Sequence, residues 1–498
     1  MTEIRFADTT IRDGHLSLWA QNMRTGMMLA IARDLDRAGF TSIECMYTHP
    51  KKTVRELKED PWERIRLLRE RITETPLRTI VGRFPQFDLS PPFLLAMRLR
   101  CEARAGIRQA RISDEWNQAD MWAWKIRAAR EVGIDPIVNL IYSYSPKHTD
   151  AYYAERAAQL AALRPFRICL KDPGGLLTPE RLRTLVPAVL ANTGDIHVEL
   201  HSHCTTGLGP LNALEAVKLG IRTVNTGVPP LANGTALPSV FNVAANLRVM
   251  GYEPVFDEAA ARAVSEKLTA IAAHDGLPPG RPVEYDAAQY QHQVPGGMLT
   301  NLRHQLKLVG MEDRYADTLA ECARVREEWG WPIMVTPLSQ FVGSQAAINV
   351  ITGERYKEVT DQTILYALGY WGGQEAIDGM DTDVRDRILA RPRAKEIAAA
   401  PPPEPTEADL RARYGGPGVS EEELLLRMEC SDAELAAMRA AGPPRDYEHL
   451  DAASPLVELV AQLTQRSDRH FIQVQKGDLA LTLARGAAPE PAPTAGHA

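Results

Sequence analysis

The first half of the chain alternates short runs rich in apolar and β-branched residues with longer amphipathic stretches. We interpret eight of the short runs as strands, at residues 4–10, 42–46, 77–81, 109–113, 135–143, 166–172, 195–203 and 222–227. The amphipathic stretches between them predict helices, among them residues 27–40, 61–72, 119–133 and 179–194. Eight strand–helix alternations within about 250 residues predict a (β/α)8 TIM barrel rather than an open sheet with helices on both faces.

The pattern changes after the eighth alternation. It is helical from about Ala270 to about Ala400, and the proline-rich residues 400–405 are typical of a stiff linker. Short charged helices and a candidate strand pair follow, and the low-complexity tail is typical of disorder. We therefore predict an α/β protein with a mainly α-helical C-terminal domain, divided into a barrel (1–275), a helical domain (276–400), a C-terminal segment (401–485) and a disordered tail (486–498).

Composition restricts the possible function classes. Of the 498 residues, 45% are hydrophobic and 24% charged, as in a soluble globular protein of two or three domains. A net charge of −7 predicts no basic surface for nucleic acid or for an acidic membrane. No apolar run reaches the roughly 18 residues of a membrane-spanning helix, and the start lacks a signal-peptide profile. The six scattered cysteines indicate neither a disulfide framework nor a cysteine zinc site, so we expect a cytoplasmic protein.

The strongest candidate chemistry is the tripeptide His201-Ser202-His203, which closes an apolar run. Residues two apart on a strand point to the same side, so this stretch aims two imidazoles at one point. Such a pair suits a borderline metal ion. The alternative is a pair of surface histidines at the end of a strand.

Two further residues fall on the same rim of the predicted barrel, where the carboxyl ends of the strands form barrel active sites. Asp13 follows the first strand, and Lys171 ends the sixth. A lysine ammonium has no lone pair, so Lys171 could bind a metal only if deprotonated or converted to a carbamate, which supplies oxygen. The alternative is a lysine in a salt bridge at the rim.

Several motifs carry a resemblance to a known family. They run along the chain as DTTIRDGHLSLWAQNMRT, EDPWERIRLL, YSPKHT, LKDPGGLL, LHSHCTTG, QVPGGMLTNL and VTPLSQFVGSQAAINV. The chain resembles the carboxyltransferase component of biotin-dependent pyruvate carboxylase and of oxaloacetate decarboxylase, and most closely the keto-acid subunit of transcarboxylase. The resemblance implies a biotin-dependent carboxyltransferase in which the helical domain completes an active-site funnel over the barrel.

The resemblance also implies the cofactors. A divalent metal, Zn, Mn or Co, would be held by Asp13, Lys171 as N6-carboxylysine, His201 and His203. The acceptor would react as an enolate, and the metal would act as a Lewis acid on the developing oxygen charge. The residues do not decide which of the three metals is bound, because imidazole and carboxylate suit them all.

Two other residues match the reacting side of the family site. Thr336, in VTPLSQ, matches the hydroxyl that relays a proton between the biotin nitrogen and the acceptor carbon. Arg12 matches the arginine that contacts the carbonyl side of the acceptor. The alternatives are an ordinary threonine before a proline and an ion pair at the barrel rim.

Three departures from the family pattern are expected in the acceptor pocket. Leu16 replaces a glutamine, and Gly82 stands where the family has a carboxylate-binding arginine. Arg83 is its neighbour, but a one-residue slip on a strand faces the opposite side. Ala110 replaces an aromatic residue beside the retained Arg111. An unpaired buried oxygen costs roughly 1–3 kcal/mol, so we predict a substrate site that includes Leu16, Arg83 and Arg111 and takes an altered acceptor. The alternative is local drift with a compensating pose.

The sequence also predicts partners. It contains no Met-Lys dipeptide, so biotin is expected on a separate carrier subunit and its ATP-dependent carboxylation on a biotin carboxylase subunit. The segment 471–484 is a candidate docking element, or a small hairpin of no special role. We expect a small-molecule acceptor and a homodimer. Two other functions stay open: a metal-dependent aldolase or acyl-CoA lyase of the same barrel superfamily, and a non-catalytic scaffold subunit of a carboxylase complex.

Overall fold

The structure is a computed structural model of the chain. It describes residues 1–46, 51–82, 91–295, 299, 302–303, 306–307, 310–400, 404–450, 463, 471–476 and 479–484. The chain forms two compact units, Met1–Glu448 and His449–Ala498. All of the predicted site residues belong to the first unit.

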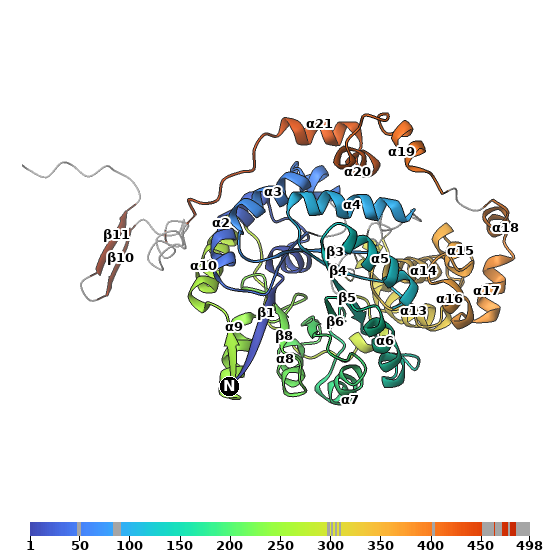
Figure 1. The fold of residues 1–498 in the computed structure, drawn as a ribbon, viewed down its shortest axis with the longest axis horizontal. Helices are drawn as coiled ribbons and strands as arrows, with labels where there is room; N and C mark the ends of the chain where they lie inside the picture. Colours follow the sequence, from blue (N-terminus) through green and yellow to red (C-terminus); the bar gives the residue numbers. More distant parts are fainter. Residues whose placement is uncertain are drawn as a thin grey trace, which may run out of the picture. The chain divides into compact units, whose positions relative to one another are not determined.

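A closed barrel of parallel strands forms the centre of the first unit (Figure 1). Its strands are β1 (Thr2–Asp8), β2 (Ile43–Met46), β3 (Leu77–Val81), β4 (Gln109–Ile112), β5 (Asp135–Ile141), β6 (Arg167–Asp172), β7 (Val198–Ser202) and β8 (Thr223–Thr226). They pair in chain order, and pairing of β1 with β2 closes the cylinder. The eight predicted strands are present, and the predicted TIM-barrel fold is confirmed. A further strand that the sequence did not predict, β9 (Tyr252–Val255), pairs beside the start of β1.

Helices surround the barrel (Figure 1). The main ones are α2 (Thr25–Arg37), α3 (Pro61–Arg71), α4 (Pro92–Ala105), α5 (Ala119–Glu131), α6 (Asp150–Ala162), α7 (Pro179–Leu190), α8 (Gly209–Lys218), α9 (Val240–Val249) and α10 (Glu258–Asp275), and the shorter turns are η1 (Thr10–Gly14), α1 (His15–Leu18) and η2 (Thr53–Leu57). The side chain of Asp60 caps α3, and that of Thr178 caps α7. Both helices then start with a proline, whose missing N–H is not needed in the first turn.

A helical region follows the barrel within the first unit. It comprises α11 (Gln289–His292), η3 (Glu312–Arg314), α13 (Tyr315–Glu328), α14 (Leu338–Thr352), α15 (Asp361–Ala367), α16 (Gly373–Gly379), α17 (Thr382–Leu389), α18 (Pro392–Ala399), α19 (Glu407–Arg413), α20 (Glu421–Glu429) and α21 (Asp432–Ala440). Trp329 and Trp371 are among the buried residues of its own apolar core. Within the stretch expected to be helical, most of residues 296–309 lie outside the described residues. None of the described helices is long and apolar enough to cross a membrane.

This helical region packs on one end of the barrel. Gln118 Nε2 donates to the carbonyl oxygen of Gly372 at 2.8 Å, and Arg326 Nη2 donates to Ser143 Oγ at 2.9 Å. The two contacted barrel residues lie in the segments that follow β4 and β5. The helical region therefore borders the end of the barrel at which the strands finish.

The second unit contains an antiparallel strand pair, β10 (Phe471–Lys476) and β11 (Leu479–Ala484). Its register pairs Phe471 with Ala484 and Lys476 with Leu479. The predicted strand pair is therefore confirmed. The predicted disordered tail (486–498) and the first prolines of the predicted linker (401–403) lie outside the described residues.

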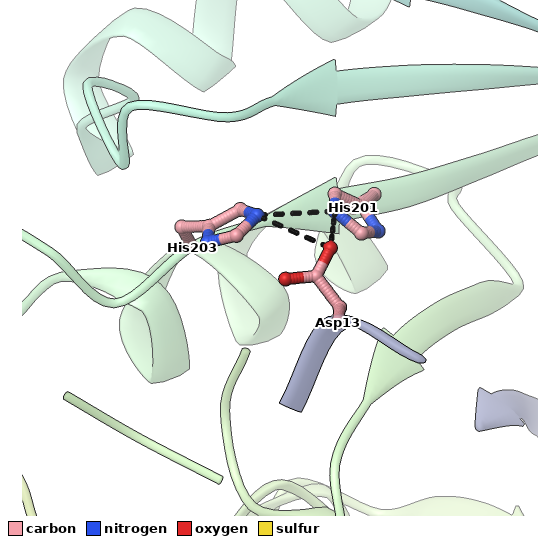
Figure 2. A group of neighbouring side chains, drawn as sticks. All are labelled: Asp13, His201 and His203. Atoms are coloured by element: carbon pink, nitrogen blue, oxygen red, sulfur yellow. Dashed lines mark hydrogen bonds and ion pairs between the residues drawn. The ribbon is translucent and has the colours of Figure 1, made fainter. Parts of the chain in front are cut away.

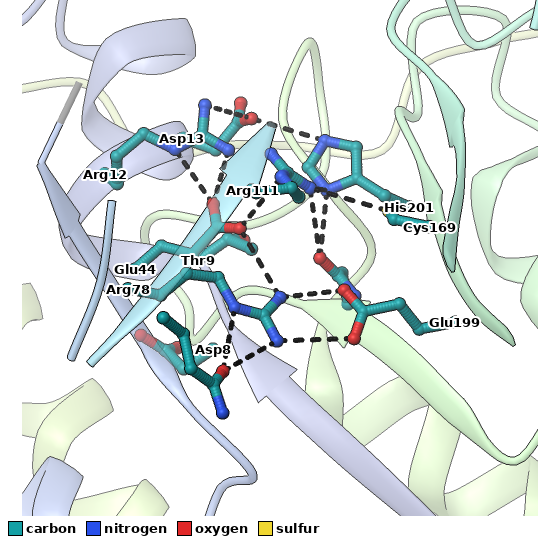
Figure 3. A network of polar contacts seen from close by, with 12 residues as sticks. Asp8, Thr9, Arg12, Asp13, Glu44, Arg78, Arg111, Cys169, Glu199 and His201 are labelled. Carbon is teal, nitrogen blue, oxygen red and sulfur yellow. Dashed lines mark hydrogen bonds and ion pairs between the residues drawn. The ribbon is translucent and has the colours of Figure 1, made fainter. Parts of the chain in front are cut away.

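The interior of the barrel is charged, whereas barrel interiors are usually filled by layers of branched apolar residues. Five residues form what we call the barrel charge network: Arg12, Glu44, Arg78, Arg111 and Glu199 (Figure 3). All except Arg12 are completely buried. Arg78 Nη1 lies 2.7 Å from Glu199 Oε1, and Arg111 Nε lies 3.2 Å from Glu44 Oε1. Because a buried charge without a partner is strongly destabilising, these contacts constrain how the strands come together.

We predict that Arg78→Met lowers the free energy of unfolding by about 3–5 kcal/mol, because it leaves a carboxylate buried without its closest partner. The double variant Arg78→Met/Glu199→Gln should recover part of that loss. Urea unfolding followed by circular dichroism measures both. Arg164→Met breaks an exposed surface pair with Asp195 and should leave the unfolding midpoint unchanged. An Arg78→Met variant as stable as the wild type would contradict the prediction.

Candidate active site

Asp13, His201 and His203, here called the ligand group, converge at the carboxyl end of the barrel (Figure 2). His201 is on β7 and His203 directly follows it. Their Nε2 atoms are 3.3 Å apart, and Asp13 Oδ2 lies 3.4 Å and 3.6 Å from them. All three side chains are buried. Two imidazole nitrogens and a carboxylate oxygen at this spacing form a donor set that fits a divalent metal ion.

Asp13 reaches the ligand group on η1, a single π-helical turn between β1 and α1. Such wide turns redirect side chains and are frequent at functional sites. Asp8 holds the start of the turn, because its carboxylate accepts from the Thr10 hydroxyl at 2.5 Å and from the Thr10 N–H at 3.2 Å. Gly14 lets the turn pack closely, since a Cβ there would lie 2.6 Å from the carbonyl oxygen of Leu231.

The second nitrogen of each histidine also has a partner. His203 Nδ1 lies 2.7 Å from the carbonyl oxygen of Thr235, and His201 Nδ1 lies 3.1 Å from Asn225 Oδ1. Both partners accept hydrogen bonds, so a proton on Nδ1 would pair with them and leave the Nε2 lone pair for a metal. Burial, together with the neighbouring Arg111, holds the pKa of His201 well below its usual value, so this imidazole is neutral.

Lys171, on β6, is paired in register with His201 on β7. Its side chain is buried, and burial, with Arg111 and Arg12 nearby, lowers the pKa of the amine to about 8. Its Nζ makes no hydrogen bond among the residues that the structure describes. A substantial fraction of this amine is neutral near pH 8, which is the form that can react with CO2.

Arg12 links the ligand group to the barrel charge network. Its Nη1 lies 2.7 Å from Asp13 Oδ2, and its Nε donates to Glu44 Oε2 at 2.9 Å. Burial alone would raise the pKa of Asp13, but Arg12 and the neighbouring histidines His203 and His201 hold it well below its usual value. Asp13 is therefore ionised, as a metal ligand must be. The ion pair expected as the alternative for Arg12 is present, and its contact with an acceptor stays a prediction.

The structure places Arg111 inside the barrel, beside His201. It is completely buried, its Nη1 contacts His201 Nδ1, and the same nitrogen donates to Asn225 Oδ1 at 3.2 Å. These partners give Arg111 a position beside His201, and its predicted role in substrate binding stays a prediction. Ala110 faces the opposite side of β4, towards the surrounding helices, because side chains alternate along a strand. Its replacement therefore does not alter the acceptor pocket directly.

Among the remaining residues, Leu16 and Gly82 follow barrel strands at the same end of the barrel. Leu16 is on α1 and partly exposed, and Gly82 directly follows β3. Arg83 lies outside the described residues. Thr336 is partly exposed in the turn before α14 and forms no hydrogen bond with the ligand group in the described part of the chain.

Sequence reasoning missed three polar residues that support the site: Glu44, Glu199 and Asn225. Each stands in an otherwise apolar strand, in SIECM, IHVELHSH and RTVNTG respectively. Glu199 is two residues before His201, so the alternation that pairs the two histidines also places Glu199 inside the barrel. A polar residue in phase with the histidines was the signal that could have identified Glu199.

Comparison with known proteins relates most of the chain to carboxylases. A family model described as a conserved carboxylase domain matches residues 290–461, and one described as HMGL-like matches residues 108–268. A pyruvate carboxylase subunit of Methanocaldococcus jannaschii is 34% identical over 438 residues, which cover 85% of this chain and 75% of that protein. The methylmalonyl-CoA carboxyltransferase 5S subunit of Propionibacterium freudenreichii subsp. shermanii is 30% identical over 390 residues, which cover 75% and 74%.

The fold has a counterpart among solved structures. The carboxyl transferase domain of Rhizobium etli pyruvate carboxylase superposes with a TM-score of 0.78 at 23% identity, covering 97% of this chain and 84% of that one. At this level of identity the likeness supports the fold alone.

Asp8, which holds the turn that carries Asp13, should make the free energy of unfolding depend on pH. Burial raises the pKa of Asp8 from 3.8 to about 7, and the hydrogen bonds from Thr10 only partly oppose this. Between these two values the folded protein holds a proton that the unfolded chain releases, so this contribution to stability falls as the pH rises through that window. Asp8→Asn removes this titrating group and with it the pH-dependent contribution. Urea unfolding should show the variant gaining roughly 2 kcal/mol relative to wild type between pH 5 and pH 8. A difference independent of pH would contradict the prediction.

Proposed function

Because the chain belongs to the family of biotin-dependent carboxyltransferases, we propose that it moves a carboxyl group between carboxybiotin and an enolisable 2-oxo acid or related carbonyl compound. The observation that carries this proposal is the ligand group, in which two imidazoles and one carboxylate converge beside Lys171 at the carboxyl end of a barrel. Catalysis in barrel enzymes takes place at this end.

The donor set fits a divalent ion of the Zn, Mn or Co type. Asp13, His201, His203 and Lys171, once carboxylated, would hold it. Bound there, the ion would supply Lewis-acid stabilisation of the negative charge that develops on the enolate oxygen of the acceptor. The lowered pKa of Lys171 supports the carboxylation, because CO2 reacts with the neutral amine.

The reaction breaks the bond between the biotin nitrogen and its carboxyl carbon and forms a carbon–carbon bond to the acceptor. A proton must pass from the acceptor carbon to that nitrogen. The Thr336 hydroxyl would relay it, accepting one proton while giving up its own. Arg12 would contact the carbonyl side of the acceptor. Helices of region 276–400 border this end of the barrel, which supports a funnel that excludes water.

We infer that the acceptor pocket departs from the pattern that the resemblance implies. Leu16, three residues after Asp13 and partly exposed, brings an apolar side chain where the resemblance implies an amide. Gly82 has no side chain to clamp a carboxylate. We infer an acceptor that is larger than pyruvate or less dependent on a carboxylate clamp.

The relatives are named as subunits, which supports partners on other polypeptides. A biotin carrier subunit would bring carboxybiotin, and a biotin carboxylase subunit would charge it. The strand pair β10–β11 would provide a docking element for the carrier, and the chain would act as a homodimer in the cytoplasm.

The lyase alternative has one observation in its favour, the HMGL-like match at residues 108–268. The carboxylase match at residues 290–461 favours the carboxyltransferase, because it covers the segment that holds Thr336. A lyase would cleave a carbon–carbon bond without biotin.

The test is transfer of labelled carboxyl between carboxybiotin and a panel of 2-oxo acids, with Mn²⁺ present. We expect carboxyl transfer, and we expect a chelator to abolish it.

Thr336→Ala should lower kcat by roughly 10²- to 10⁴-fold, the usual contribution of a positioned proton donor or acceptor, and leave metal content unchanged. Thr352→Ala, which removes a hydroxyl that donates within helix α14, is the matched control and should retain activity. If no acceptor received the label, the chain would be a non-catalytic scaffold subunit. Cleavage of a carbon–carbon bond without biotin would favour the lyase.

Leu16→Gln tests the altered pocket. Restoring an amide should raise kcat/KM for pyruvate by roughly 5- to 150-fold, equivalent to about 1–3 kcal/mol, because a buried substrate oxygen regains a partner. Leu18→Gln, on the same short helix α1, is the control. Wild-type turnover of pyruvate that exceeds turnover of every larger acceptor would contradict the altered pocket.

A further inference from the structure

We propose that Asn225 is a positioning residue that holds His201 in the form that can bind the metal. The inference rests on the proposed function, because it concerns the same ligand group. Asn225 is on β8, is completely buried, and lies inside the barrel beside His201. It has no place in the ligand set that the sequence predicts.

The carboxylate of Glu199 fixes the orientation of the Asn225 amide. Its Nδ2 donates to Glu199 Oε1 at 3.2 Å. A carboxylate can only accept, so the nitrogen end of the amide must face Glu199 and the oxygen end must face His201. The carboxylate is itself held by Arg78, at 2.7 Å. A flipped amide would set an oxygen against a carboxylate inside the barrel.

The oxygen end then decides the position of the proton on His201. Two groups reach His201 Nδ1: Asn225 Oδ1, which only accepts, and Arg111 Nη1, which only donates. If Nδ1 carries the proton, it donates to Asn225 and the Nε2 lone pair is free for a metal. If Nδ1 accepts from Arg111, the proton moves to Nε2 and blocks that lone pair.

Asn225 acts on this competition because its Oδ1 also lies within hydrogen-bond distance of Arg111 Nη1, at 3.2 Å. One oxygen thus offers an acceptor to both donors, and Arg111 has a hydrogen-bond acceptor other than the imidazole nitrogen. Without the oxygen, the contacts of Arg111 Nη1 among the described residues would be His201 Nδ1 and the Cys169 thiol, the latter at 3.9 Å. His203 needs no such device, because its Nδ1 faces the backbone carbonyl of Thr235.

The test is the affinity of the purified full chain for Mn²⁺, measured by titration against a chromogenic chelator. Asn225→Leu should weaken binding by roughly 10- to 100-fold, the usual effect of losing a hydrogen-bond partner of a metal-ligating histidine. Asn225→Ser, whose hydroxyl is too short to reach the imidazole, should behave alike and replaces the leucine variant if that one does not fold.

Two further variants separate positioning from a general loss of structure. Thr223→Val removes another hydrogen bond to a histidine from the same strand, the one between Thr223 Oγ1 and His197 Nε2 at 2.8 Å. It should leave Mn²⁺ affinity unchanged. Asn225→Asp/Glu199→Gln exchanges the amide and the carboxylate. An acceptor oxygen at position 225 then still faces His201, and the amide at position 199 donates to that carboxylate. The Mn²⁺ affinity of this double variant should return to within about threefold of wild type.

The outcomes separate this inference from the proposed function. A wild-type chain that binds no divalent metal would overturn the proposed function together with the inference. Wild-type binding with equal affinity in Asn225→Leu or Asn225→Ser would overturn the inference alone. Weakened binding in Thr223→Val as well would show that β8 is merely destabilised, which also overturns it.

Discussion

The active-site end of this barrel depends on Glu44, a single carboxylate that is completely buried between arginines. It pairs with Arg12 at 2.5 Å and with Arg111 at 3.2 Å. Burial alone would raise the pKa of Glu44, but Arg111, Arg12 and a third arginine hold it below its usual value, so the group stays ionised. Each of these two arginines contacts a different member of the ligand group, Asp13 or His201. The position of one buried acid is thereby transmitted to two of the side chains that would hold the metal.

The charges around the site explain why a lysine suits the fourth position. The guanidinium groups of the barrel charge network face the carboxylates of Glu44, Glu199 and Asp13, which leaves little net charge in the barrel interior. A neutral Lys171 preserves that balance while the site holds no ion. A carbamate on the same nitrogen would add a negative charge as a divalent cation arrives. A permanent fourth carboxylate would instead be an unpaired buried charge whenever the ion is absent, which is strongly destabilising.

The sequence predicted the strands and site residues that follow from periodicity. It did not predict the contacts that form only when the barrel closes. Eight strands, the convergence of His201 and His203 and the position of Asp13 follow from alternation and from the rule that barrel sites form where strands end. The partners of Arg111 did not follow, because a side chain inside a barrel meets residues from strands far away in sequence. The wide turn η1 could not be predicted either, since it requires the close approach of Gly14 to a loop more than two hundred residues later. The strand β9 extends the sheet through backbone hydrogen bonds, which leave little trace in a hydrophobic pattern.

The central claim is that the ligand group and Lys171 bind one metal ion. Anomalous diffraction at the zinc absorption edge, from crystals grown with Zn²⁺ and bicarbonate, tests it most directly. The account predicts one strong peak about 2.0–2.2 Å from the Nε2 atoms of both histidines and from an Asp13 oxygen, with added density for a carboxyl group on Lys171 Nζ. A saturated crystal with no peak between these side chains, or with its zinc bound elsewhere, would contradict the account.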